Sequence, residues 1–250
     1  MELLLLSNST NFGEAMYSHA ADAFAELAGD DQIVFVPYAL ADWDDYGARA
    51  IDAFAELGLD ATSAHLCDEP DRAILEAKVV MMGGGNTFRL LDSLYHLDLL
   101  GRLTARVRAG QTRYAGASAG TNVACPTIRT TNDMPICQPP HLDALGLIPF
   151  QINLHYLDAD PDSTYMGETR DTRIEEFLEE NDCPVLAMYE GSWLRVSAAH
   201  AEVTGPAKLF KRGSCDSYAN GADVSPFLRL SPHFDGGPRP RQCRSSADLR

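Results

Sequence analysis

The sequence has no long apolar run and no paired cysteine motif. No stretch of eighteen apolar residues occurs, so a membrane-spanning helix is not expected. The first residues, including the apolar run 3–6, lack the basic flank and the small-residue cleavage site of a secretory signal. Six cysteines are scattered without CxxC spacing, which favours free thiols over a disulfide or zinc framework. These absences predict a cytoplasmic protein.

Positive charge is also scarce. The chain has 20 lysines and arginines against 36 aspartates and glutamates, a formal net charge of -16. This excess repels phosphate backbones and anionic lipid surfaces, so neither nucleic acid nor a membrane is expected as a partner. An anionic ligand would require arginines placed locally in its site.

Short apolar runs alternate with helical patterns through much of the chain. The runs are typical of buried parallel strands and cover residues 3–6, 33–36, 79–82, 114–115 with their flanks, and 185–188. Apolar spacing of three and four predicts helices over residues 15–27, 46–57 and 88–108, each with a glycine near its end. Because strands and helices alternate, we expect an α/β fold with a mostly parallel sheet and helices on both faces.

The C-terminal part of the chain has a different pattern. Short alternating segments over residues 193–210 predict a small antiparallel extension at the sheet edge. Residues 231–250 are rich in Pro, Gly, Arg and Ser, which predicts a mobile tail without a catalytic role. No internal repeat or linker is visible. We therefore expect a single domain over residues 1–230.

A GxSxG pattern spans residues 116–120, directly after a short apolar run and before a helix-compatible stretch that begins at Ala119. A strand-to-helix turn at this place can hold the Ser118 hydroxyl out as a nucleophile. Serine is a poor nucleophile until a neighbouring base takes its proton, and that base usually needs a carboxylate to orient it.

Candidates for the base and the acid lie further along the chain. His155 follows a predicted strand around residues 147–152, and Asp133 lies in the polar loop 130–135. Taken alone, each has an ordinary alternative, a packed histidine and an aspartate in a turn. The order Ser118, Asp133, His155 matches the α/β-hydrolases, but the acid and histidine follow the serine too closely for that fold. A different fold carrying the same trio is expected.

Three glycines, residues 83–85, follow the strand predicted over 79–82. Glycines before a helix allow backbone N–H groups to face a ligand. No P-loop lysine and no GxGxxG pattern accompany them. We expect an oxyanion hole in which Gly84 and Gly85 act with the N–H of Ala119. A simple tight turn is the alternative.

Several segments together resemble the peptidase E family. They are MELLLLSNST at the start, GGGNTF from Gly83, SAG from Ser118, ACPTIRTTNDMPI from Ala124, QIN from Gln151 with His155, and GETR from Gly167. The resemblance implies a cytoplasmic serine dipeptidase that removes N-terminal aspartate, with a fold like the class I glutamine amidotransferases. It also implies Ser118 as nucleophile, His155 as base and Asp133 as the third member. Ala117 and Leu154 depart from the tryptophan and proline that relatives often carry.

An aspartyl substrate presents a carboxylate, and a guanidinium can bind it through two hydrogen bonds. Arg170 is the first candidate for this role, and Arg173 and Arg129 are the alternative candidates. Asn86 is a further candidate for contact with the substrate. Arg170 and Arg173 begin a predicted helix that runs to Glu180. Surface ion pairs on that helix are the alternative.

Two other functions stay open at this stage. A cyanophycinase-like enzyme that cleaves β-aspartyl polymers would share the serine turn, and a non-catalytic small-molecule binding protein could share the fold. A metal hydrolase is less favoured, because His141, His155, Asp158 and Asp160 match no HExxH-like spacing. We expect no metal and no cofactor, and the sequence leaves both a monomer and a homodimer open.

Overall fold

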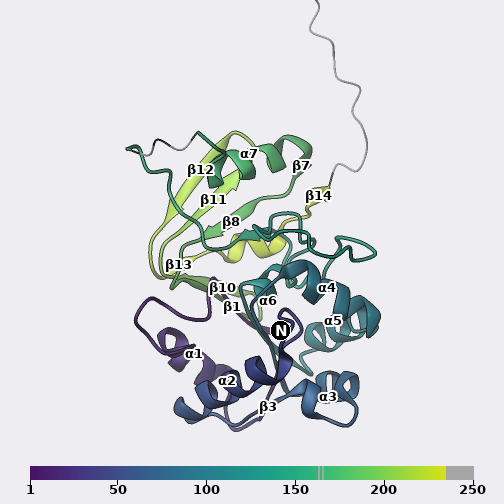
Figure 1. The fold of residues 1–250 in the computed structure, drawn as a ribbon. Coiled ribbons are helices and arrows are strands. Elements are labelled where there is room, and N and C mark those ends of the chain that lie inside the picture. The colour runs from purple at the N-terminus through teal and green to yellow at the C-terminus, as the bar shows by residue number, and fades with distance from the viewer. Residues whose placement is uncertain (163, 165, 235–250) are drawn as a thin grey trace, which may run out of the picture.

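A large sheet and a smaller one frame the protein in the computed structural model, which describes residues 1–162, 164 and 166–234 (Figure 1). The larger sheet has eight strands in the order β13-β10-β9-β1-β5-β4-β2-β3. Its parallel part consists of β1 (Glu2–Leu6), β5 (Arg113–Ala117), β4 (Val79–Met82), β2 (Ile33–Val36) and β3 (Ala61–Ser63). The antiparallel part consists of β9 (Trp193–Ser197), β10 (His200–Thr204) and β13 (Ala222–Asp223).

Helices cover both faces of the larger sheet, as the alternating pattern predicted. Successive strand side chains point to opposite faces, so Leu3 and Leu5 join one buried cluster and Leu4 and Leu6 join another. The first cluster includes residues of α3 (Pro70–Glu76), α4 (Thr87–His96) and α5 (Leu100–Arg108). The second includes residues of α1 (Ala21–Ala28) and α2 (Trp43–Glu56). Short 3-10 helices, Ser18–Ala20 and Ala64–Leu66, lie before α1 and after β3.

The prediction of a single helix over residues 88–108 is wrong. The chain forms α4 and α5 with a break at Asp98, whose φ of 51° lies in the left-handed region. Aspartate tolerates this conformation better than most residues. The Leu99 N–H donates to the Leu94 carbonyl across the break, so both helices keep their leucines in the core.

The second sheet has four strands in the order β12-β11-β8-β6. They are β12 (Ser214–Tyr218), β11 (Ala207–Lys211), β8 (Val185–Met188) and β6 (Gln151–Asn153). Helix α7 (Arg170–Glu180) packs on it through Ile174 and Leu178, next to Val185 and Phe210. Residues 185–188 were expected in the large parallel sheet, but their neighbours are β6 and β11. The predicted edge extension holds for β9 and β10, whereas β11 belongs to this second sheet.

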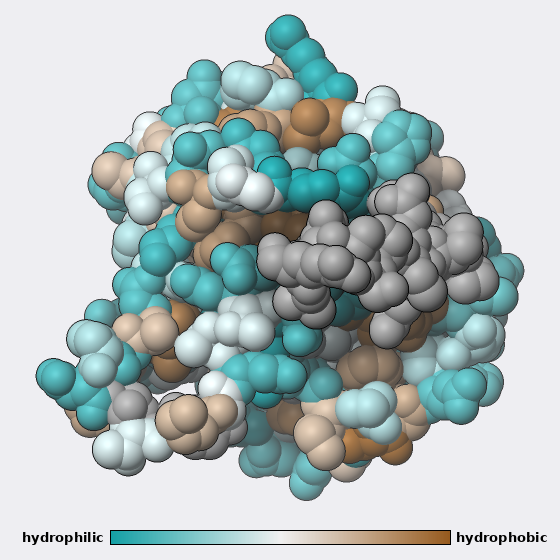
Figure 2. Space-filling view, turned by 90° about the horizontal axis from the view of Figure 1, so that it is seen from above, coloured by the Kyte–Doolittle hydropathy of each residue, from teal (hydrophilic) through white to brown (hydrophobic). Residues whose placement is uncertain are grey.

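The start of the predicted tail forms a short strand. Strand β14 (His233–Phe234) pairs with β7 (Asn181–Asp182), and a 3-10 helix, Ser225–Arg229, precedes it. Residues 235–250, the rest of that predicted tail, lie outside the described residues. No helix in the described part of the chain has the length and apolar character needed to cross a bilayer. Seen from above, hydrophilic residues dominate the surface and hydrophobic groups lie between them (Figure 2).

Candidate active site

Ser118 lies in the predicted sharp turn between β5 and the short helix α6 (Ala119–Asn122). Its φ of 50° and ψ of -110° are strained for a residue with a side chain, and such strain clusters at functional sites. Glycines make the turn possible. A Cβ added to Gly120 would lie 2.1 Å from the Met82 carbonyl oxygen, and one on Gly116 would lie 2.5 Å from the Gly120 backbone. Both glycines of GxSxG therefore permit close backbone packing beneath the serine.

The imidazole of His155 reaches Ser118 from the second sheet. His155 follows β6, has a φ of 51°, and places Nε2 at 3.0 Å from the Ser118 Oγ. Ser7, buried just after β1, fixes this approach. Its hydroxyl donates to the Met188 carbonyl at 3.0 Å and accepts from the His155 backbone N–H at 3.0 Å. One hydroxyl thus joins the ends of β1 and β8 to the segment that carries the histidine.

The other ring nitrogen of His155 meets Glu190. The His155 Nδ1 lies 3.0 Å from the Glu190 Oε1. Glu190 follows β8, which runs parallel to β6, so the carboxyl ends of the two strands bring both side chains to one edge. Glu190 is not among the residues predicted from the sequence. The available signal was an acidic residue just beyond an apolar strand, which is the same kind of position that pointed to His155.

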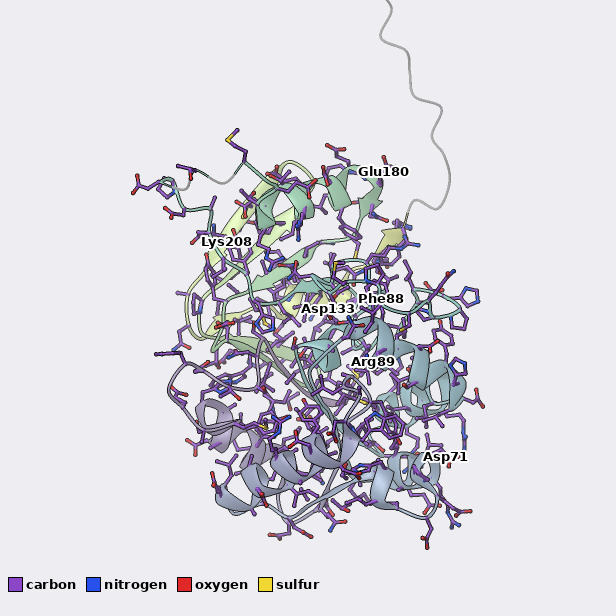
Figure 3. All side chains as sticks on the ribbon, in the orientation of Figure 1. Asp71, Phe88, Arg89, Asp133, Glu180 and Lys208 are labelled. Atoms are coloured by element: carbon purple, nitrogen blue, oxygen red, sulfur yellow. The ribbon has the colours of Figure 1, made fainter. Side chains whose placement is uncertain are left out.

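The expected contact between Asp133 and His155 is wrong. The carboxylate that contacts the imidazole of His155 is that of Glu190. The Asp133 Oδ2 accepts hydrogen bonds from the Thr87 backbone N–H at 2.8 Å, the Thr87 hydroxyl at 2.5 Å and the Thr131 hydroxyl at 3.1 Å. Figure 3 shows Asp133 close to Phe88 at the start of α4. A carboxylate is favourable there because the first N–H groups of a helix lack partners inside it.

The glycine turn, Gly83–Gly85, lies directly beside the serine. A Cβ added to Gly84 would lie 3.3 Å from the Ser118 Cβ. Within the described residues, no backbone carbonyl accepts a hydrogen bond from the N–H groups of Gly85 and Ala119. Burial raises the pKa of Tyr46, and a hydrogen bond from the Gly84 backbone partly offsets this effect.

A pocket of about 330 Å³ opens over these groups. Its lining includes Ser118, His155, Glu190, Gly84, Gly85 and Asn8. The serine follows β5, the glycines follow β4 and Asn8 follows β1, which are adjacent parallel strands. Ligands of open α/β sheets bind at this carboxyl edge. The geometry can support attack by a serine hydroxyl on a bound carbonyl group.

The residues predicted to bind substrate lie outside this pocket lining. Asn86 caps α4, accepting from the Arg89 N–H and donating to the Met134 carbonyl. Arg173 faces Glu168 at 3.4 Å on the surface. Arg129 contacts Asn181 and the ring of Phe234.

Arg170 is the first residue of α7 and is partly buried. Its guanidinium has no hydrogen-bond or ion-pair partner within the described residues. Burial lowers the pKa of Arg170, and the nearby charge of Arg173 lowers it further. A partly buried guanidinium without an ionic partner would be stabilised by binding an anionic group.

Comparison with known proteins gives consistent results. The family profile described as "Peptidase family S51" matches residues 3–204. A "Peptidase E" of Streptomyces coelicolor is 51% identical over 243 residues, covering 96% of this chain and 100% of the relative. A "Probable alpha-aspartyl dipeptidase" of Drosophila melanogaster is 43% identical over 233 residues, 91% of this chain and 97% of that one. The crystal structure of a peptidase from an acI-B1 actinobacterium superposes with a TM-score of 0.66 at 14% identity, covering 89% of this chain and 96% of the other.

Proposed function

This chain belongs to peptidase family S51, and from that membership we propose that it is a serine dipeptidase acting on dipeptides with an N-terminal aspartate. One observation carries the proposal. Ser118, His155 and Glu190 form a continuous relay with 3.0 Å between each pair of facing atoms, and the serine occupies a strained turn. The name of the Drosophila relative supports the aspartyl substrate. Peptides are the expected partners of the pocket.

The relay performs acyl transfer in two halves. With its proton on Nδ1, His155 donates to Glu190 and accepts the Ser118 proton at Nε2 as Oγ attacks the peptide carbonyl carbon. The C–N bond then breaks, and the imidazolium gives its proton to the leaving amine. Water, deprotonated by the same imidazole, attacks the ester and releases aspartate and free Ser118.

For the oxyanion of the tetrahedral intermediate, we propose the N–H groups of Gly85 and Ala119. These donors lie beside the serine without a backbone acceptor in the described part of the chain. Gly84 contributes by its lack of a side chain, since a Cβ there would press on Ser118. Removing one such donor typically costs about 3 to 4 kcal/mol of barrier lowering.

For the aspartate side chain, Arg170 is proposed, supported by its partly buried and unpaired guanidinium within the described residues. Arg173 and Asn86 are engaged elsewhere. A cytoplasmic location is proposed as well. It is supported by the free thiols of the cysteines in the described residues, since Cys67, Cys125, Cys137, Cys183 and Cys215 form no disulfide.

The test compares five substrates and one variant. The purified protein is assayed with Asp-Leu, Glu-Leu, Asn-Leu and acetyl-Asp-Leu, and with a β-aspartyl polymer. We expect rapid hydrolysis of Asp-Leu alone, because the site must bind both the side-chain carboxylate and the free amine. Ser118→Ala should abolish turnover and leave the circular dichroism spectrum and melting temperature unchanged. Preferred cleavage of the polymer, or full activity of Ser118→Ala, would refute the proposal.

A further inference from the structure

The pocket contains a cation that the proposed chemistry does not use. Among the described residues that line it, Arg49 is the single lysine or arginine. It lies on α2, which covers one face of the large sheet, while His155 and Glu190 reach the pocket from the second sheet. The protein has a formal net charge of -16, so an anion would meet an unfavourable field over most of the surface. The guanidinium of Arg49 places a positive charge in the pocket, whose lining also includes Glu190.

The contacts of Arg49 leave part of it available. Its Nε donates to the Asp45 Oδ2 at 2.9 Å, and its side chain is 51% exposed. Neither terminal nitrogen of Arg49 has a hydrogen-bond acceptor within the described residues. Arg72 on α3 is the contrasting case. Its Nε donates to Glu76 and one terminal nitrogen donates to Glu69, so two carboxylates occupy it.

Tyr46 fixes the guanidinium relative to the nucleophile. The Arg49 guanidinium carbon lies 5.4 Å from the centre of the Tyr46 ring, within the range of a cation–π contact. Tyr46 is 4% exposed, and its hydroxyl would lie 3.8 Å from a Cβ on Gly84. The same Cβ would lie 3.3 Å from the Ser118 Cβ. Packed neighbours therefore connect Arg49 to the serine through a buried ring and a glycine.

We propose that Arg49 binds a carboxylate of the dipeptide substrate through its terminal nitrogens, an inference that rests on the proposed function. An aspartyl dipeptide has a side-chain carboxylate and a C-terminal carboxylate, each separated from the scissile carbonyl carbon by the same number of bonds. With the scissile carbonyl at Ser118, either carboxylate can therefore approach a side chain that lines the pocket. A guanidinium binds either one in a two-bonded geometry. The binding of a free C-terminus would also explain a preference for dipeptides over longer peptides.

The experiment measures kcat and KM of the wild-type protein, Arg49→Met and the control Arg72→Met. The substrates are Asp-Leu and its C-terminal amide, which lacks the second carboxylate. We expect Arg49→Met to lower kcat/KM for Asp-Leu by about tenfold, the low end for a charged hydrogen bond because the side chain is half-exposed. Arg72→Met should match the wild type. A neutral organophosphorus probe should label Ser118 equally in all three proteins, which shows that the relay is intact.

The amide separates the two carboxylates. A loss on Asp-Leu with no loss on the amide assigns Arg49 to the C-terminal carboxylate, whereas equal losses on both assign it to the side chain. An Arg49→Met protein that is labelled normally and hydrolyses both substrates as Arg72→Met does would overturn the inference. Retained activity in Ser118→Ala would instead overturn the proposed function, so the two failures are distinguishable.

Discussion

Glu190 and Asp133 are carboxylates with different partners, and isosteric substitution separates their roles. Glu190→Gln keeps the shape of the group next to His155 but removes the charge proposed to stabilise the imidazolium. We expect kcat to fall by about a hundredfold to ten-thousandfold, with KM and the melting temperature nearly unchanged. Steady-state kinetics with Asp-Leu measure the effect.

Asp133→Asn is the matched control for that substitution. It weakens the hydrogen bonds that Asp133 accepts from Thr87 and Thr131, which hold the loop against the start of α4. We expect a loss of about 1 to 2 kcal/mol in the free energy of unfolding, measured by urea denaturation, and a smaller kinetic effect than Glu190→Gln. The reverse order of kinetic effects would restore Asp133 to the relay.

Arg170→Met tests the residue proposed to bind the aspartate side chain. Loss of the proposed charged hydrogen-bond pair at this partly buried position, roughly 3 kcal/mol, corresponds to about a hundredfold lower kcat/KM on Asp-Leu. Arg173→Met on the same helix serves as control, because Arg173 faces Glu168 on the surface. Equal kinetics in the two variants would remove Arg170 from the proposed site.

Among individual residues, the sequence pointed to those candidate side chains whose positions follow from a local sequence pattern. Ser118 lies in a GxSxG turn, and His155 follows a strand, so both could be selected without coordinates. Glu190 could not, because its contact with His155 depends on β6 and β8 being parallel neighbours in a second sheet. Asp133 was selected from its place in a polar loop and through a family resemblance, and its partners are the nearby Thr131 and, far from it in the sequence, Thr87 at the start of α4.

The elements most sensitive to change are those that support the serine turn. Gly120→Ala would place a Cβ 2.1 Å from the Met82 carbonyl oxygen, where two backbones meet. We expect a loss of more than about 3 kcal/mol in the free energy of unfolding, since neither backbone can move without disturbing the sheet. Gly101→Ala in α5 is the opposite case, because nothing lies within 4 Å of its added Cβ. That variant should gain about 0.5 kcal/mol. Similar melting temperatures for the two variants would contradict the packing argument.

Elements were predicted well where the pattern was local. Most strands of the parallel core and α7 agree with apolar runs and helical spacing in the sequence. The break between α4 and α5 was missed because leucines at helical spacing continue through it, and only the backbone at Asp98 marks the change. The sheet to which β8 belongs depends on long-range pairing, for which an apolar run carries no information.

Across the whole molecule, the site exists only where the two sheets meet. Ser118 and the glycine turn come from the large sheet, and His155 and Glu190 come from the small one. Ser7 links them, since its hydroxyl donates to the carbonyl of Met188, the last residue of β8, and accepts from the His155 backbone N–H. The relative position of the sheets should therefore control catalysis through this buried hydroxyl.

Ser7→Ala tests that control. The variant leaves the His155 N–H without its buried acceptor and leaves the Met188 carbonyl with the Tyr156 N–H as its remaining donor, which should cost about 1 to 3 kcal/mol of stability. It should also lower kcat, because His155 is no longer held at Ser118. Thr112→Val is the matched control. Thr112 is equally buried and its hydroxyl donates to the Ala77 carbonyl at 2.8 Å, away from the pocket. Both variants should lose stability in urea denaturation, but only Ser7→Ala should lose kcat on Asp-Leu. Equal activity in the two variants at equal stability loss would show that the imidazole is positioned without Ser7.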